Sequence, residues 1–330
     1  MRAIVQEGYG SPDVLKLRDI DRPTVADDGV LIRVRAASVN AMDSHFVHSP
    51  RVLGAMMGVT RKWPVRGVDV AGDVEAVGKN VTRFHIADAV YGFAHGSFAD
   101  YATTAEGMLA MKPRNASYEQ AAATPMAAIT ALQALRDFAN VQPGQRVLIH
   151  GAGGGVGTFA VQIAKALGAR VTAVTSTRNM DVVTALTPDD VIDYTREEFA
   201  ARGQRWDVFF DNAATRPIRD CMRVLSPTGI LLAVGAPKAG MLKMVTHMLG
   251  ILVRSRVGKG RVRMVMAKGR YPDLDSLREM IEAGTIAPVI DRRYALAEVP
   301  EAIRYVRAGQ GRAKVVIDIA QRSETSLTKV

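Results

Sequence analysis

A glycine-rich turn at residues 151–157 carries the clearest chemical signal in this chain of 330 residues. It reads Gly-Ala-Gly-Gly-Gly-Val-Gly and follows the short apolar run Val147–Ile149. Glycines let the backbone turn tightly and approach a pyrophosphate, whose charge meets the free N–H groups of the following helix. The turn therefore predicts a dinucleotide site. The alternative is a tight turn that binds nothing, because Ala152 replaces one glycine of the Gly-x-Gly-x-x-Gly fingerprint. The expected cofactor contacts here are Gly151, Gly154, Gly155, Val156 and Gly157.

The end of the next apolar run, residues 170–175, distinguishes between two dinucleotides. In NAD-binding units an Asp or Glu about 20 residues after the glycines accepts hydrogen bonds from the ribose hydroxyls. Here Ser176 and Arg178 stand in that region, and no carboxylate does. Hydroxyl groups and a guanidinium suit a 2′-phosphate, which a carboxylate would repel. NADP(H) is therefore favoured over NAD(H), with Arg178 as a solvated cation at a helix start as the alternative.

Two further apolar runs, Asp207–Asn212 and Gly229–Gly235, end in polar or glycine positions. An open parallel sheet binds its ligand at the carboxyl ends of its strands, so Asn212 and Gly235 are expected to border the cofactor. Apolar residues at helical spacing follow the glycine turn. The elements that must position the site are therefore the strands and helices of an α/β domain with a parallel sheet.

The chain changes character along its length. Residues 1–120 contain short β-rich runs between Gly, Pro and Asp turns, which is typical of a compact, partly barrel-like β domain. Residues 121–270 carry the strand–helix–strand pattern, and residues 271–330 return to helix, strand, helix and strand. We interpret the last part as rejoining the first domain, with a nucleotide-binding domain inserted between. The length of the chain also favours two domains.

Composition narrows the class of protein. Hydrophobic residues make up 48% of the chain, which suits a well-packed soluble globule. Cys221 is the single cysteine and excludes an intramolecular disulfide and any cysteine-built zinc site. The N-terminal residues lack the long apolar run of a signal peptide, so a cytoplasmic location is the simplest expectation.

The net charge of +10 comes from one segment, residues 221–272, which contains ten Lys or Arg and no Asp or Glu. Within it, residues 239–253 are apolar and Met-rich but too short to span a bilayer. The segment could cover the substrate cleft or a subunit interface, with its cations solvated. Alternatively, residues 239–270 could contact an anionic membrane surface peripherally. The segment does not favour nucleic-acid binding, because aromatic residues do not interleave with the cations.

Several short motifs, in this order and spacing, resemble the medium-chain dehydrogenase/reductase superfamily and its zinc-free, quinone oxidoreductase-like branch. The resemblance covers nearly the whole chain. It implies a GroES-like β-rich substrate domain, a Rossmann doubly wound parallel sheet, and a homodimer. The motifs are Glu7–Leu15, Ala37–Asp43, Gly67–Gly72, Gly96–Tyr101, Thr124–Thr130, the glycine turn, Asp190–Tyr194 and Ile286–Asp291.

The same resemblance implies that no zinc is bound. Zinc-dependent relatives place Cys where this chain has Asn40, and Gly-His-Glu where it has Gly67–Asp69. They also carry a four-cysteine zinc loop, for which this chain has no cysteines. His45 and His48 are close to Asn40 in sequence, but without a thiolate we expect them to be solvated or packed.

The resemblance also implies roles for individual side chains. Asn40 lines the cleft beside the nicotinamide and could hydrogen-bond a substrate carbonyl, while Asp43 braces its loop. Thr130 is similar to the threonine that contacts the carboxamide. Arg178 and Tyr194 match positions that border the adenosine phosphate. Structural alternatives are a turn residue for Asn40, a helix cap for Asp43 and a back-bonded helix residue for Thr130.

Without a metal to polarise an isolated carbonyl, the favoured chemistry is hydride transfer from NADPH to a quinone or an activated alkene such as an enone or enal. Such an acceptor delocalises the incoming charge toward its oxygen, where hydrogen bonds can stabilise it. Tyr9 is a candidate proton donor. Two alternatives stay open: a zinc-free alcohol or aldehyde oxidoreductase of the same superfamily, and an NADPH-binding partner protein without appreciable turnover.

Overall fold

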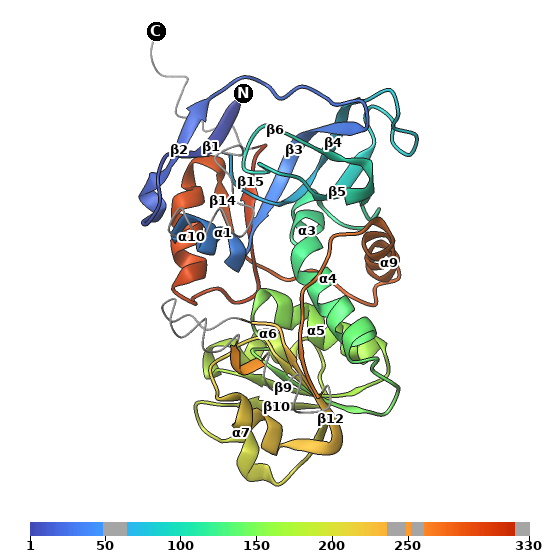
Figure 1. Ribbon diagram of the computed structural model, residues 1–330, viewed down its shortest axis with the longest axis vertical. Coiled ribbons are helices and arrows are strands. Elements are labelled where there is room, and N and C mark those ends of the chain that lie inside the picture. Colours follow the sequence, from blue (N-terminus) through green and yellow to red (C-terminus); the bar gives the residue numbers. More distant parts are fainter. Residues whose placement is uncertain (49–64, 236–248, 252–260, 321–330) are drawn as a thin grey trace. The chain divides into compact units, whose positions relative to one another are not determined.

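The computed structural model describes residues 1–48, 65–235, 249–251 and 261–320, and the chain forms two compact units (Figure 1). The first unit comprises Met1–Met126, Gly269–Gly284 and Pro288–Val330, and the second comprises Ala127–Lys268 and Thr285–Ala287. Helix α4 (Pro125–Gln133) carries the chain from the first unit into the second.

The first unit is built on a seven-stranded sheet in the order β14-β15-β3-β4-β5-β7, with β6 also paired to β3. Strands β1 and β2 form a separate antiparallel pair. Apolar residues such as Ile32, Val74 and Phe98 form its buried core. The strands are β1 (Arg2–Gln6), β2 (Leu15–Asp19), β3 (Gly29–Val39), β4 (Asp69–Val77), β5 (Ala89–Phe93), β6 (Tyr101–Ala105), β7 (Leu109–Met111), β14 (Ile290–Ala295) and β15 (Lys314–Asp318). The helices are α1 (Ala41–His48), α3 (Tyr118–Ala122), α9 (Tyr271–Glu282) and α10 (Val299–Arg307), with short 3₁₀ turns η1 (Pro12–Val14), η2 (Glu106–Met108) and η6 (Leu296–Glu298).

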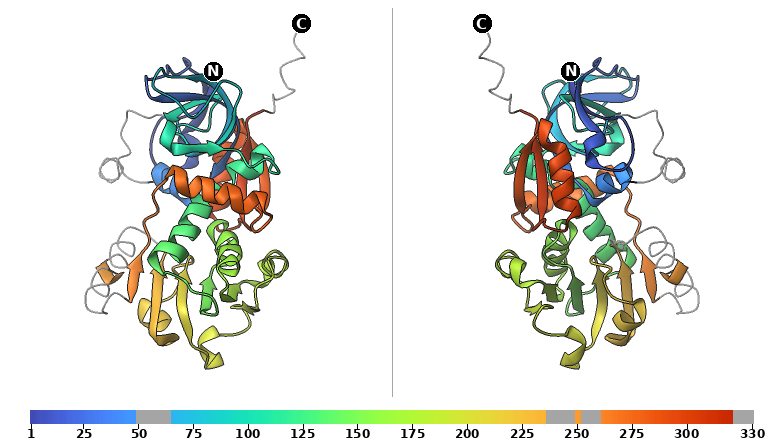
Figure 2. Two further views of the ribbon diagram at one scale, coloured as in Figure 1. Left: turned by 90° about the vertical axis from the view of Figure 1, so that its right-hand side faces the viewer. Right: turned by 90° about the vertical axis from the view of Figure 1, so that its left-hand side faces the viewer.

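The end of the chain completes this sheet. Strand β15 pairs antiparallel with β3, so that Val315 lies opposite Val39, and β14 pairs parallel with β15. The red C-terminal strands therefore lie beside the blue N-terminal ones in Figures 1 and 2. As a result, residues near 40, 69 and 314 are close in space although they are far apart in sequence.

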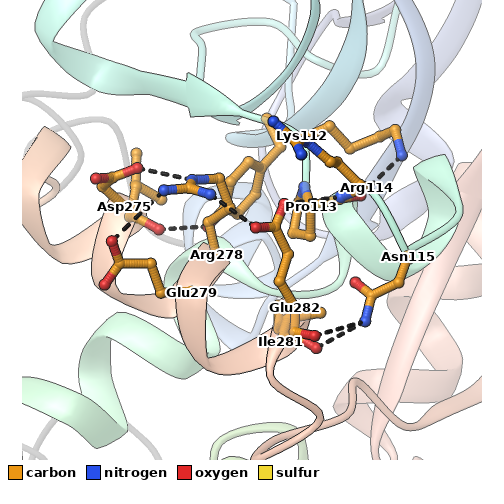
Figure 3. Close-up of polar contacts among 11 residues, drawn as sticks. Lys112, Pro113, Arg114, Asn115, Asp275, Arg278, Glu279, Ile281 and Glu282 are labelled. Carbon is orange, nitrogen blue, oxygen red and sulfur yellow. Dashed lines mark hydrogen bonds and ion pairs between the residues drawn. The ribbon is translucent and has the colours of Figure 1, made fainter.

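Helix α9 brings the chain back into the first unit and is fastened to the loop after β7 (Figure 3). The Asn115 side chain donates to the carbonyl of Ile281 at 2.9 Å, at the carboxyl end of the helix. The Glu282 carboxylate accepts from the Arg114 backbone N–H at 3.0 Å and from Arg278 at 2.8 Å. The Asn115 contact satisfies a backbone carbonyl that a helix end otherwise leaves without a partner, and the contact between Glu282 and Arg114 ties the helix to the loop.

The second unit contains a six-stranded parallel sheet in the order β10-β9-β8-β11-β12-β13. The chain winds outward from β8 to β10 and then returns to the other side of β8, so the predicted doubly wound parallel sheet is confirmed. Its inner strands are apolar on both faces, as buried parallel strands must be. The strands are β8 (Arg146–His150), β9 (Arg170–Thr175), β10 (Asp190–Asp193), β11 (Trp206–Asp211), β12 (Leu225–Ala233) and β13 (Val262–Met264). The helices are α5 (Gly155–Ala166), α6 (Met180–Thr184) and α7 (Ile218–Arg223), with single turns η3 (Ala134–Phe138), η4 (Thr177–Asn179) and η5 (Phe199–Arg202).

No helix among the described residues is long and apolar enough to cross a membrane. Most of the apolar segment 239–253 lies outside the described residues. The expectations of a cleft cover or of membrane contact through residues 239–270 therefore rest on the sequence.

Candidate functional site

The glycine turn of the second unit brings backbone atoms close together just before α5 begins. Gly151 adopts a left-handed backbone conformation, with φ of +86°. A Cβ on Gly157 would lie 2.2 Å from the carbonyl oxygen of Gly151, so any side chain there would break the turn. Gly154 is the N-cap of α5 and supplies no side-chain cap. The first backbone N–H groups of the helix, at Gly155, Val156 and Gly157, are those that need an external acceptor, which fits a pyrophosphate.

Asn212 and Gly235 lie at the same edge of the sheet as this turn. The Asn212 side chain approaches the Gly151 carbonyl at 3.4 Å, and its backbone N–H donates to His150 at 3.0 Å. A Cβ on Gly235 would lie 2.2 Å from the Asn212 carbonyl oxygen. The ends of β8, β11 and β12 therefore lie together at this edge. The strand order reverses between β8 and β11, and ligands of such sheets bind at that point.

The three residues proposed for the adenosine phosphate follow two neighbouring strands. Ser176 and Arg178 come after β9, and the exposed Tyr194 comes after β10. Strand β10 pairs parallel with β9, with Asp193 opposite Thr175, so the chain leaves both strands at the same edge. The structure thus brings these side chains into one neighbourhood.

Sequence reasoning missed Asp193 in this neighbourhood. Its carboxylate accepts from the hydroxyls of Thr177 at 2.5 Å and Thr195 at 2.7 Å. The hydrogen bond from Thr177 lowers the pKa of Asp193. The Thr177 hydroxyl is therefore already used within the protein, and Ser176, Arg178 and Tyr194 stay the candidate phosphate donors. The sequence offered one signal for this contact, because Asp193 is an acidic residue at the carboxyl end of an apolar strand.

A second group that sequence reasoning missed is a buried pair directly behind the glycine turn. The imidazole of His150 contacts the carboxylate of Asp211 at 3.0 Å, and both side chains are buried. Asp211 also accepts from the backbone N–H of Ala214 at 2.9 Å. Since β8 and β11 pair in register at these two residues, the pair fixes the loop that carries Asn212.

The first unit holds its own polar cluster where β15, β3 and β4 lie side by side. Asn40 follows β3, Asp69 begins β4, and Lys314 begins β15. The Asn40 Nδ2 donates to Asp69 at 2.9 Å, while Lys314 donates to the Asn40 Oδ1 at 2.7 Å and to Asp69 at 3.4 Å. Asp69 also accepts from the Ser38 hydroxyl at 2.7 Å and from the Met126 backbone N–H at 3.1 Å.

Lys314 was not identified from the sequence, although a charged residue at the start of an apolar strand is an available signal. Its side chain is only 3% exposed, and that of Asp69 is fully buried. Burial lowers the pKa of Lys314, and the carboxylates of Asp69 and Asp43 oppose that shift. Because a buried charge is costly without partners, the contacts of Lys314 with Asn40 and Asp69 stabilise its ammonium group inside the candidate site.

Asp43 lies beneath the Asn40 loop. One carboxylate oxygen accepts from the Asn40 backbone N–H at 2.7 Å. The other oxygen, Oδ1, is buried and has no hydrogen-bond partner among the residues that the structure describes. Burial raises the pKa of this carboxyl to about 7. Asp43 can therefore hold or release a proton near neutral pH.

Tyr9, Thr130 and the histidines near Asn40 lie on separate elements. Tyr9 lies in the partly buried bend between β1 and η1, and Thr130 lies on α4 in the second unit. His45 lies on α1, and the side chain of His48 lies outside the described part. Within the described ranges, no three His, Cys, Asp or Glu side chains form a group that could hold a metal ion.

Two family descriptions match different parts of the chain. Residues 26–114 match the alcohol dehydrogenase GroES-like domain, and residues 186–317 match the family described as zinc-binding dehydrogenase. A GroES-like unit combined with a doubly wound sheet defines the class of medium-chain dehydrogenases/reductases.

Known proteins place the chain more narrowly within this class. It is 31% identical to 2-methylene-furan-3-one reductase of Solanum lycopersicum, across 96% of this chain and 79% of that protein. It is 32% identical to the chloroplastic NADPH-dependent alkenal/one oxidoreductase of Arabidopsis thaliana, with the same coverage of 96% and 79%. The solved quinone oxidoreductase from Coxiella burnetii superposes with a TM-score of 0.84 at 28% identity, covering 97% of this chain and 99% of that one.

This chain belongs to the quinone oxidoreductase-like branch of the medium-chain dehydrogenase/reductase superfamily. The family and the oxidoreductase class that the sequence predicted are confirmed. The individual roles of the site residues stay predictions.

The close approach at Gly157 yields a stability prediction. Gly157→Ala should lower the free energy of unfolding by about 1–3 kcal/mol, because the added methyl group would overlap the Gly151 carbonyl. Alanine at an unobstructed helical position would instead be neutral or stabilising. Gly107→Ala, where nothing lies within 4 Å of the added Cβ, is the matched control. Urea unfolding of both variants measures the difference, and equal effects would contradict the crowding.

Asp43 yields a pH prediction. Its pKa rises from 3.8 to about 7 on folding, so the folded chain binds more protons than the unfolded chain between those values. The wild type therefore loses stability from this group as the pH rises through that window. The difference in free energy of unfolding between Asp43→Asn and the wild type should therefore shift by about 2–3 kcal/mol in favour of the variant from pH 5 to pH 8.

Urea unfolding at the two pH values tests this expectation. Asp27→Asn, which removes an exposed carboxylate paired with Lys79, is the control and should follow the wild type. Parallel curves for wild type and Asp43→Asn would show that Asp43 does not titrate in this range.

Proposed function

We propose that this protein is an NADPH-dependent oxidoreductase that reduces quinones or activated alkenes, such as enones and enals, without zinc. The turn at Gly151–Gly157 carries the cofactor assignment. A Cβ on Gly157 would lie 2.2 Å from the Gly151 carbonyl oxygen, and the N-terminus of α5 has no side-chain cap. The activities for which the relatives are named, which include NADPH-dependent alkenal/one oxidoreductase, support the same reaction class.

The second unit supplies the residues that would hold the cofactor. The backbone of the glycine turn would bind the pyrophosphate, and Asn212 and Gly235 would border it. Ser176, Arg178 and Tyr194 would bind the adenosine phosphate, and Thr130 would contact the carboxamide. When bound, NADPH supplies a hydride.

The first unit supplies the groups that would act on the acceptor. A quinone or conjugated carbonyl spreads incoming charge onto its oxygen, so a positioned hydrogen-bond donor stabilises the charge that develops there. The Asn40 carboxamide is the proposed donor, and Asp43 supports its loop through the 2.7 Å contact to the Asn40 N–H. Tyr9 is the proposed proton donor.

We also propose a homodimer and a cytoplasmic location. Strand β13 lies at the edge of the described six-stranded sheet, and the nearby Met266 is 66% exposed. An edge strand beside exposed apolar residues suits pairing with a second chain. A monomer in sedimentation equilibrium would contradict the dimer. Peripheral membrane contact through residues 239–270 remains the alternative use of that region.

An acceptor panel tests the reaction. NADPH oxidation should be at least roughly tenfold faster with quinones, enals or enones than with saturated aldehydes, because only conjugated acceptors delocalise the added charge. Metal content is measured on the same purified protein. Oxidation of simple alcohols without zinc would identify a zinc-free alcohol or aldehyde oxidoreductase instead, and stoichiometric zinc would contradict the proposal of a zinc-free enzyme. Tight NADPH binding without reduction of any acceptor would identify a binding protein.

Arg178 yields a prediction on cofactor choice. Arg178→Ala should raise the Kd for NADPH roughly ten- to hundredfold, the loss expected for a charge-assisted hydrogen bond, and should change the Kd for NADH little. Arg170→Ala removes an exposed cation at the opposite, amino end of the same strand and serves as the control. Fluorescence titration with both nucleotides measures the ratio. Equal weakening of both nucleotides by Arg178→Ala would remove its role in phosphate recognition.

A further inference from the structure

The side-chain amide of Asn40 is held in one orientation by two buried charged groups. Lys314 contacts its oxygen at 2.7 Å, and Asp69 contacts its nitrogen at 2.9 Å. An ammonium group can only donate hydrogen bonds and a carboxylate can only accept them. The oxygen must therefore face Lys314 and the nitrogen must face Asp69, since a flipped amide would put donor against donor and acceptor against acceptor.

The partners of Asp69 make this orientation stable. Besides Asn40 and Lys314, the carboxylate accepts from the Ser38 hydroxyl at 2.7 Å and from the Met126 backbone N–H at 3.1 Å. All four partners are donors, so Asp69 has no hydrogen to offer the amide. The register of the sheet adds a further restraint, because Ser38 lies opposite Asp69 and Val39 lies opposite Val315.

The arrangement leaves the amide with one N–H group that Asp69 does not use. It also places a positive charge against the amide oxygen, and hydrogen bonds in series polarise one another in a low-dielectric interior. Lys314 thereby draws electron density toward the amide oxygen and makes the remaining N–H a stronger donor. Burial of the ammonium, with 3% of its side chain exposed, limits screening by water.

We propose that Lys314 and Asp69 are positioning residues that orient and polarise the Asn40 carboxamide, so that its remaining N–H binds an acceptor oxygen on which negative charge develops. This inference rests on the proposed function and specifies its substrate class. The acceptor must carry a carbonyl-type oxygen conjugated to the reacting carbon. Positive charge reaches that oxygen through the amide, and Lys314 itself touches Asn40 and Asp69.

A double-mutant cycle tests whether Lys314 acts through Asn40. Asn40→Ala should lower kcat with a quinone or enone by ~10²-fold, the usual effect of removing one oxyanion donor. Lys314→Met keeps most of the side-chain length but removes the charge and the donors, and should lower kcat roughly tenfold because the Asn40 donor is weakened and not lost. In the Asn40→Ala background, Lys314→Met should change kcat by less than about twofold. Independent, multiplicative losses would overturn the inference.

Two companion variants separate this effect from misfolding. Lys314→Met leaves the buried Asp69 without its cation, which can destabilise the fold. The combination with Asp69→Asn removes both charges and should restore the unfolding free energy while kcat stays low. Lys79→Met removes an exposed lysine paired with Asp27 and should leave kcat unchanged. Recovery of kcat together with stability would show that Lys314 is only structural.

Two readouts do not depend on turnover. The Kd of NADPH should stay within about twofold of wild type in Lys314→Met, since energetically independent sites do not couple. A much weaker cofactor affinity with unchanged kcat would make Lys314 a cofactor ligand instead. In amide proton–nitrogen spectra, the Asn40 side-chain signals, assigned by their loss in Asn40→Ala, should shift in Lys314→Met. Unchanged signals would show that the ammonium does not polarise the amide.

The first measurement separates this inference from the proposed function. The wild-type protein is assayed with NADPH and the acceptor panel before any variant is made. If it reduces no quinone, enone or enal, the proposed function fails. If it reduces them but the cycle is multiplicative, the proposed function stands and only the role of Lys314 and Asp69 is lost.

Discussion

A buried carboxylate must be surrounded by hydrogen-bond donors, and in this protein that requirement joins three distant parts of the chain. Asp69 is fully buried and collects donors from Ser38, Asn40, Met126 and Lys314. Leaving any buried charge without its partners is costly. The cluster therefore holds β15, β3 and β4 in one register, and that register sets the position of Asn40.

In the second unit, a buried polar pair and a glycine turn hold the strand ends in place. The ends of its parallel strands carry polar groups at one edge, and the order of the strands reverses between β8 and β11. The buried pair of His150 and Asp211 fixes the loop behind the glycine turn, and glycines remove the side chains that would obstruct it. The result is a helix N-terminus without a side-chain cap, and such a terminus suits a phosphate group.

The two units provide complementary chemistry. One has an uncapped helix N-terminus that suits an anion, and the other has a side-chain amide in contact with the buried Lys314. An acceptor that delocalises negative charge onto an oxygen needs an oriented donor more than it needs a strong acid. This is why the polar cluster of the first unit is consistent with reduction of conjugated acceptors.

The sequence by itself determined the features that depend on neighbouring residues. The glycine turn, the doubly wound pattern and the lack of a carboxylate beside Arg178 are all encoded within short stretches, where periodicity and backbone freedom act locally. Only the tertiary structure showed that the Thr177 hydroxyl donates to Asp193, and that the imidazole of His150 contacts Asp211 on the neighbouring strand. The contact of Lys314 with Asp69 joins residues 245 positions apart. No local pattern specifies such a pair, because strand register and burial are decided by the packing of the whole unit.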